Sequence, residues 1–180
     1  MYQELIQNLT ISLGNDRSSE NRQMWTNYIF KEDIELIHLT ALLDAEHPVG
    51  MRFTWLLGHI IEKDPNKITP IVSYCFENRD KWTFPGIKRT LAKMLWLAGV
   101  PEEIEGLVVD QLFQWILDPK VKVAVKVYGM DALYNMVLKY PDLKEELLIV
   151  IDDQWDKNSV AFRARGKRVL KALQAKKKLD

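Results

Sequence analysis

The sequence has very little cysteine and no long apolar run. Cys75 is the single cysteine among the 180 residues, so the chain cannot form an internal disulfide, and a reducing compartment is favoured. No segment approaches the roughly 20 apolar residues that a membrane-spanning helix needs. The first residues also lack the basic start and apolar core of a signal peptide. These absences predict a cytoplasmic protein without a membrane span.

The residue patterns of common catalytic sites are also missing. The three histidines, His38, His47 and His59, have no second histidine at helical spacing, as a metal site would need. Cys75 lies among apolar residues, with no base nearby in the sequence to generate a thiolate. No glycine-rich phosphate loop and no Gly-x-Ser-x-Gly elbow occurs. We therefore expect no metal and no cofactor, and the sequence favours a non-catalytic protein.

An excess of charge of either sign is absent as well. Lys plus Arg and Asp plus Glu both number 25, so the formal net charge is zero. This balance argues neither for nor against a nucleic-acid partner. Any electrostatic preference must come from how the charges are distributed along the chain.

Glycine and proline number only 8 and 7, and they occur where helices would begin or end. Between them, apolar residues recur at spacings of three and four, which is typical of amphipathic helices. The sequence therefore predicts an all-α protein with about 9–10 helices, and Ser18 and Asp33 are the expected N-caps of two of them. The expected helices cover residues 2–13, 18–31, 33–43, 48–63, 66–79, 85–98, 102–117, 120–139, 142–157 and 159–177.

A repeat organises these helices. The turn inside each expected hairpin reads proline, one or two polar residues and an aliphatic residue, as at Pro65, Pro101 and Pro141. A second marker, an aspartate followed closely by a lysine, ends each hairpin; it occurs at Asp80, Asp118 and Asp156. Both markers recur with a period of about 38 residues, which is typical of stacked units that cannot bury their apolar faces alone.

Two of these units resemble the HEAT repeat. The segment Asp118-Pro119-Lys120-Val121-Lys122-Val123-Ala124-Val125 is similar to the Asp-Pro-x-Val-Arg-x-x-Ala opening of a HEAT repeat, with Lys122 in place of the usual arginine. Pro48-Val49-Gly50-Met51-Arg52 is similar to the same opening with its basic residue kept. The resemblance to this armadillo-type family implies an α-α superhelix of stacked antiparallel helix hairpins.

The resemblance also implies a domain organisation. We expect one HEAT-like domain over residues 1–180, in which residues 1–47 form an N-terminal cap or a degenerate repeat because they match the pattern poorly. The repeats are expected at 48–80, 85–118 and 119–157, followed by a C-terminal capping helix at 159–180.

The charges divide between the two helices of each hairpin. Each first-helix segment carries a net positive charge, and each second-helix segment carries a net negative charge. In HEAT-like solenoids the second helices typically line the concave face, so the resemblance implies an acidic groove that binds a protein or peptide with a basic segment. Trp82, in a turn beside Phe84, is a further candidate contact, with packing between hairpins as the alternative. The expected partner-binding residues are Asp110, Glu145, Glu146, Asp152, Asp153, Asp156 and Trp82.

A second interpretation of the acidic residues needs no partner. Acids favour the first turns of helices, which accounts for Glu102, Glu103, Glu105 and Asp142. It does not account for Asp152, Asp153 and Asp156, which lie at the other end of their expected helix.

The alternative function is a nucleic-acid-binding HEAT-like module. The last expected helix carries basic residues that would attract phosphates, at Arg163, Arg165, Lys167 and Arg168. Basic residues also suit the polar outer face of a terminal repeat. The run 152–155, Asp-Asp-Gln-Trp, has the residue types of a HEAT-like DNA glycosylase site, but it lies in the acidic set of helices, which would repel phosphates.

Overall fold

The computed structural model describes residues 2–84 and 86–176, with side chains up to Gln174. All regular secondary structure in these ranges is helical, so the predicted all-α fold is confirmed. The chain divides into two compact units, unit 1 (residues 1–98) and unit 2 (residues 99–180). No helix in the described ranges has the length and apolar character needed to cross a bilayer.

Unit 1 is organised around its third α-helix. Its described α-helices are α1 (Tyr2–Asn15), α2 (Ser19–Lys31), α3 (Val49–Lys63), α4 (Val72–Glu77) and α5 (Ile87–Leu97). Its short 3-10 helices are η1 (Leu36–Leu43), η2 (Pro65–Lys67), η3 (Thr69–Ile71) and η4 (Arg79–Lys81). Helix α3 contacts α1, α2, α5, η1 and η2. Its side chains Phe53, Leu57 and Ile60 are fully buried, so α3 supplies the centre of the apolar core.

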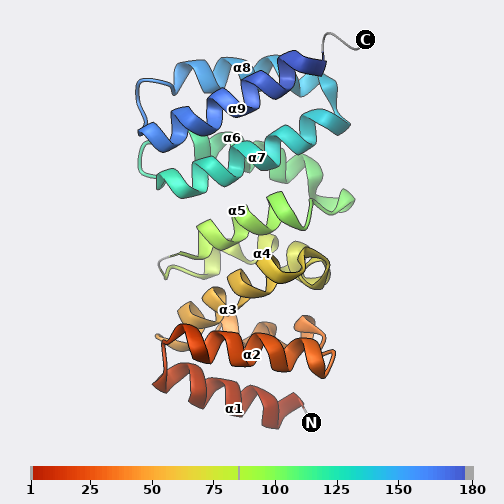
Figure 1. The fold of residues 1–180 in the computed structure, drawn as a ribbon, viewed down its shortest axis with the longest axis vertical. Coiled ribbons are helices and arrows are strands. Elements are labelled where there is room, and N and C mark those ends of the chain that lie inside the picture. The colour runs from red at the N-terminus through yellow and green to blue at the C-terminus, as the bar shows by residue number, and fades with distance from the viewer. Residues whose placement is uncertain (1, 85, 177–180) are drawn as a thin grey trace. The chain divides into compact units, whose positions relative to one another are not determined.

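Unit 2 consists of two layers of paired helices. Its described helices are η5 (Glu102–Ile104), α6 (Glu105–Leu117), α7 (Val123–Lys139), η6 (Pro141–Leu143), α8 (Lys144–Asp153) and α9 (Val160–Lys176). Figure 1 shows α7 and α9 in one layer, with α6 and α8 in the layer behind them. Helix α7 contacts the other three α-helices of the unit. Gly129 of α7 faces α6, because a Cβ atom there would lie 3.4 Å from Leu112 Cδ2, in van der Waals contact.

The predicted N-cap at Ser18 is confirmed. The hydroxyl oxygen of Ser18 accepts a hydrogen bond from the Asn21 amide at 3.1 Å and caps α2. The prediction for Asp33 is wrong, because this residue has a φ of 46° and lies in the turn that follows α2. The next element begins at Leu36 and is a 3-10 helix, so the α-helix expected over 33–43 starts later and winds more tightly.

Two expected helices are also shorter than predicted. The helix expected over 66–79 is divided into η2, η3 and α4, because Pro70 lies in the first turn of η3 and has no amide to continue a hydrogen-bonded ladder. The helix expected over 142–157 ends as an α-helix at Asp153. Asp156 therefore lies in the turn that follows α8.

The basic residue of the first HEAT-like opening connects two helices. Arg52 of α3 donates hydrogen bonds from Nη1 to the carbonyl oxygens of Leu13, at 2.7 Å, and Gly14, at 3.0 Å. These carbonyls belong to the last turn of α1, where no intrahelical donor remains. The arginine thus closes the C-terminal end of α1 and fixes it against α3.

The predicted repeat boundaries stay a prediction. The hairpin expected at 85–118 has its first helix, α5, in unit 1 and its second, α6, in unit 2. Pro85 and residues 177–180, at the ends of two expected segments, lie outside the described residues.

Replacement of two glycines of α3 by alanine should have opposite effects on the free energy of unfolding. A Cβ atom at Gly50 would lie 2.8 Å from the Ala45 carbonyl oxygen and 3.0 Å from that of Leu43, whereas nothing lies within 4 Å of a Cβ atom at Gly58. Gly50→Ala should therefore lower the free energy of unfolding by about 1–3 kcal/mol, since backbone must move. Gly58→Ala should raise it by about 0.5–1 kcal/mol through helix propensity. Urea unfolding measures both, and a stabilising Gly50→Ala would contradict the close packing.

The thiol of Cys75 should be inert in the folded protein. The side chain is 1% exposed, and burial raises the pKa of the thiol to about 12. Because only the thiolate is the nucleophile, an aromatic disulfide reagent at pH 8 should modify Cys75 only after unfolding in urea. Rapid modification without denaturant, at a rate independent of urea concentration, would show that the thiol is accessible.

Candidate partner-binding surface

The acidic candidate residues lie on two neighbouring elements of unit 2. Asp110 belongs to α6, and α6 contacts α8. Glu145, Glu146, Asp152 and Asp153 belong to α8, and Asp156 follows it in a turn. All six residues are exposed. The structure therefore brings the second helices of two predicted hairpins together with their acidic side chains at the surface.

Asp153 differs from the other acids because local partners hold it. Its carboxylate accepts hydrogen bonds from Lys157 Nζ at 2.6 Å and from Gln154 Nε2 at 2.8 Å. The bond from Lys157, followed by that from Gln154, lowers the pKa of Asp153. Its charge is thus partly compensated within its own turn, and Asp152 and Asp156 are the better sources of negative potential at this end of α8.

A depression of about 640 Å³ opens on the surface where α6 and η6 meet. The charged residues that line it are all acidic: Glu102, Glu105, Asp110 and Asp142. The remaining lining residues are Gly106, Val109, Met136, Tyr140 and Leu143. The depression therefore offers carboxylates beside apolar surface, which suits a side chain with an apolar stem and a cationic end.

Glu105 is the most buried acid of this depression, at 9% exposed. It accepts hydrogen bonds from Lys139 Nζ at 2.7 Å and from the Tyr140 hydroxyl at 2.5 Å. The bond from Lys139, then that from Tyr140, lowers the pKa of Glu105, and the bond to Glu105 raises the pKa of Tyr140. This network fixes the Tyr140 ring at the wall of the depression.

Large aliphatic side chains accompany the acids. Leu107 of α6 is 64% exposed and Ile149 of α8 is 67% exposed. Single exposed aliphatic residues are common on protein surfaces. Here they lie on the two acidic helices, so the same surface offers apolar contacts and negative charge.

The basic candidate residues of α9 are only partly available. Arg165 pairs with Asp131 of α7, and Arg168 Nη2 lies 3.6 Å from the other oxygen of this carboxylate. Arg163 donates a hydrogen bond to the Asn158 carbonyl oxygen at 2.8 Å. Lys167 is exposed. Two of the four proposed phosphate contacts therefore already face a carboxylate.

Trp82 is buried in unit 1. The residue is 5% exposed, and its Nε1 donates a hydrogen bond to Asp44 Oδ1 at 2.7 Å. The ring centre lies 6.3 Å from that of Tyr74. This environment is that of a packing residue.

The sequence alone does not single out Tyr140 or assign Asp142 to a binding surface. Tyr140 directly precedes the proline of a hairpin turn, and the sequence assigns Asp142 to a first helical turn. The turn motif was the available signal, because equivalent turns of neighbouring repeats lie close together when repeats stack.

Among the described residues, no group of three or more His, Cys, Asp or Glu side chains could hold a metal ion.

Paired amphipathic helices that pack in layers define an α-helical repeat protein. A family model described as HEAT repeat domain matches residues 3–173, and the chain belongs to this family. The match includes nearly all of residues 1–47, where the sequence motif is weak. Searches of curated proteins and of solved structures found no match. Because HEAT repeats generally mediate protein interactions, the family indicates an interaction module.

Because Asp131 is buried, we expect the free energy of unfolding to depend on pH. Burial raises its pKa from 3.8 to about 6, although Arg165 and Arg168 oppose the shift. The folded state therefore binds a proton at a higher pH than the unfolded state does, and this group favours folding more as the pH falls from 7 towards 4. Relative to Asp131→Asn, wild type should gain about 1–2 kcal/mol of unfolding free energy between pH 7 and pH 4.5.

Urea unfolding of both proteins at pH 4.5, 5.5 and 7 checks this expectation. The comparison with Asp131→Asn subtracts the contributions of all other titrating groups. If the free energy of unfolding of wild type instead falls relative to that of Asp131→Asn as the pH falls, the two arginines outweigh burial and lower the pKa of the carboxyl group.

Proposed function

We propose that this HEAT repeat protein is a non-catalytic interaction module that binds a basic segment of a partner protein on the acidic surface of unit 2. This surface consists of Glu102, Asp110, Asp142, Glu145, Glu146, Asp152 and Asp156, with the apolar side chains of Leu107, Val109 and Ile149. The proposal assigns no catalytic residue, because recognition needs only equilibrium binding.

The observation that supports the proposal most is the uniform sign of charge in the depression between α6 and η6. Four carboxylates line it, and Lys139, which directly precedes the lining residue Tyr140, is already paired with Glu105. Apolar walls lower the local dielectric constant and strengthen the field of the carboxylates. A lysine or arginine side chain could place its apolar stem against Val109 and Met136 and its charged end near Asp110.

In such a complex, apolar contacts would lower the dissociation rate, and opposite charges would raise the association rate. Surface carboxylates attract a basic partner from a distance, with a reach of about 10 Å at 0.1 M salt. Burial of Leu107 and Ile149 against a partner would remove apolar area from water at about 25 cal/mol per Å². The expected partner segment is therefore amphipathic, with basic and aliphatic residues together.

The nucleic-acid alternative has less support. It depends on α9, where Arg165 and Arg168 face the carboxylate of Asp131. It also requires phosphates to avoid the exposed acids of α6 and α8, which belong to the same unit. Binding of duplex DNA therefore separates the two functions.

Charge reversal on α6 and α8 should weaken binding of a basic segment. The probe is a fluorescein-labelled 18-residue amphipathic peptide of leucine and lysine, titrated with the full chain by fluorescence anisotropy. Wild type should bind it with an affinity that falls as salt rises from 50 to 200 mM. Asp110→Lys combined with Asp152→Lys should weaken binding by about tenfold or more, since two exposed attractive charges become repulsive. Both positions are exposed, so the variant should fold.

The matched control is Glu46→Lys combined with Glu77→Lys, which makes the same change of charge at exposed positions of unit 1. Its affinity for the peptide should stay within about twofold of that of wild type, because a change of net charge alone has a small effect. Equal weakening by both double variants would reduce the effect to net charge and contradict a specific surface. Tight binding of duplex DNA at 150 mM salt, lost in Lys167→Glu, would favour the nucleic-acid alternative instead.

A further inference from the structure

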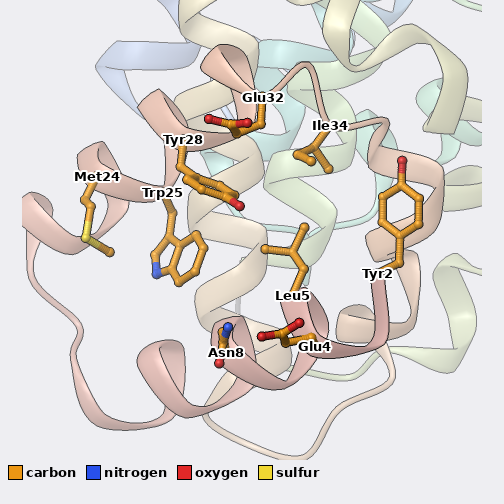
Figure 2. Close-up of a pocket in the computed structure, with 9 residues that line it drawn as sticks. All are labelled: Tyr2, Glu4, Leu5, Asn8, Met24, Trp25, Tyr28, Glu32 and Ile34. Carbon is orange, nitrogen blue, oxygen red and sulfur yellow. The ribbon is translucent and has the colours of Figure 1, made fainter.

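Unit 1 contains a second pocket that the proposed function does not use. It has a volume of about 430 Å³ and lies between α1, α2 and the segment that follows α2. Figure 2 shows the side chains that line it. These are Tyr2, Glu4, Leu5 and Asn8 of α1, Met24, Trp25 and Tyr28 of α2, and Glu32 and Ile34 beyond it.

Most of the pocket wall is aromatic or aliphatic. Leu5 and Ile34 are buried, at 7% and 6% exposed, and form its apolar base. Tyr28 is 42% exposed and Met24 is 53% exposed, so both offer apolar surface to a ligand. Trp25 lies beside Tyr28 in Figure 2. A ligand in this pocket would therefore contact ring faces and edges as well as aliphatic groups.

The Trp25 ring is held in place before any ligand binds, and the Tyr28 ring packs against it. Trp25 Nε1 donates a hydrogen bond to Ser12 Oγ at 2.8 Å, and the Ser12 hydroxyl donates to Asn21 Oδ1 at 2.8 Å. The Trp25 and Tyr28 ring centres lie 5.6 Å apart at an interplanar angle of 80°, which is a favourable edge contact. Fixed rings lower the entropy cost of binding.

The charged residues that line the pocket, Glu4 and Glu32, are both acidic. In the view of Figure 2 they stand at opposite ends of the pocket, with Tyr28 and Leu5 between them. Lys31 Nζ lies 3.5 Å from Glu32 Oε1, but this lysine side chain is 82% exposed and can move away at little cost. The complementary ligand therefore carries positive charge on a flat or apolar body.

We propose that this pocket binds an arginine side chain of a partner protein. A guanidinium group can lie against the rings of Trp25 and Tyr28 through cation–π attraction while it donates hydrogen bonds to a carboxylate of Glu4 or Glu32. Arginine fits better than lysine, because its planar and weakly hydrated group stacks on aromatic rings. This site lies in unit 1, so it is independent of the acidic surface of unit 2.

Nuclear magnetic resonance of the ¹⁵N-labelled full chain tests the proposal at the pocket itself. The probe is the peptide acetyl-Ala-Leu-Arg-Leu-Ala-amide, and the indole N–H signal of Trp25 reports occupancy. The peptide should shift this signal in a saturable way. The same peptide with citrulline, a neutral isostere, in place of arginine should bind at least about fivefold more weakly, because it keeps the shape and loses the charge.

Variants separate the contributions of charge and ring. Glu4→Gln and Glu32→Gln should each weaken binding of the arginine peptide by about twofold to fivefold, and Tyr28→Leu should weaken it by about threefold. The matched control is Glu20→Gln, an exposed glutamate of α2 that does not line the pocket and should bind like wild type. Asp110→Lys combined with Asp152→Lys should also leave this signal unchanged, which keeps the test separate from that of unit 2.

Four results would overturn the proposal. The first is the absence of a saturable shift of the Trp25 signal, and the second is equal binding of the citrulline peptide. The third is binding of ethylguanidine as tightly as the peptide, which would indicate a small-molecule site. The fourth is a concentration-dependent dimer, seen in sedimentation and lost in Tyr28→Leu, which would assign the pocket to a second copy of the chain.

Discussion

Each unit depends on the burial of one helix by its neighbours. In unit 1 that helix is α3, and in unit 2 it is α7. A helical hairpin cannot cover its own apolar face, so its stability comes from the next hairpin. The approach is close at Gly166 of α9, where a Cβ atom would lie 3.1 Å from the Trp155 ring and 3.2 Å from Ile151. The positions of α6, α8 and α9 around α7 follow from these contacts.

The distribution of charge follows from this packing. Helices α6 and α8 turn their apolar sides towards the unit's interior and keep Asp110 and Asp152 at the surface. Two basic residues of helix α9, Arg165 and Arg168, form ion pairs with the buried carboxylate of Asp131, which compensates part of the positive charge of this helix. Both depressions described above combine carboxylates with apolar walls, and rings fixed by hydrogen bonds form part of each. The two proposals thus share one principle, recognition of cations that carry apolar stems.

Local sequence signals predicted the elements better than their ends. The Ser18 cap is correct because capping depends on a side chain and an amide three residues away. The expected helices over 33–43 and 66–79 differ from the structure, because the left-handed conformation of Asp33 and the missing amide of Pro70 interrupt them. Trp82, a candidate for contact in the sequence, is buried against Tyr74 and bonded to Asp44, which is 38 residues away.

The sequence by itself determined the all-α class, the HEAT-like repeat and the sign of charge on each set of helices, because apolar spacing, proline positions and ionisable groups are local properties of the chain. Only the tertiary structure decided which side chains share a pocket. Glu102 and Asp142 line one pocket, and Tyr2 and Tyr28 line another, because packed helices bring residues distant in the sequence together. Tertiary packing likewise decided that Arg165 pairs with Asp131. A buried carboxylate needs a charged or hydrogen-bonding partner, and only the packing of the helices decides which residue lies close enough.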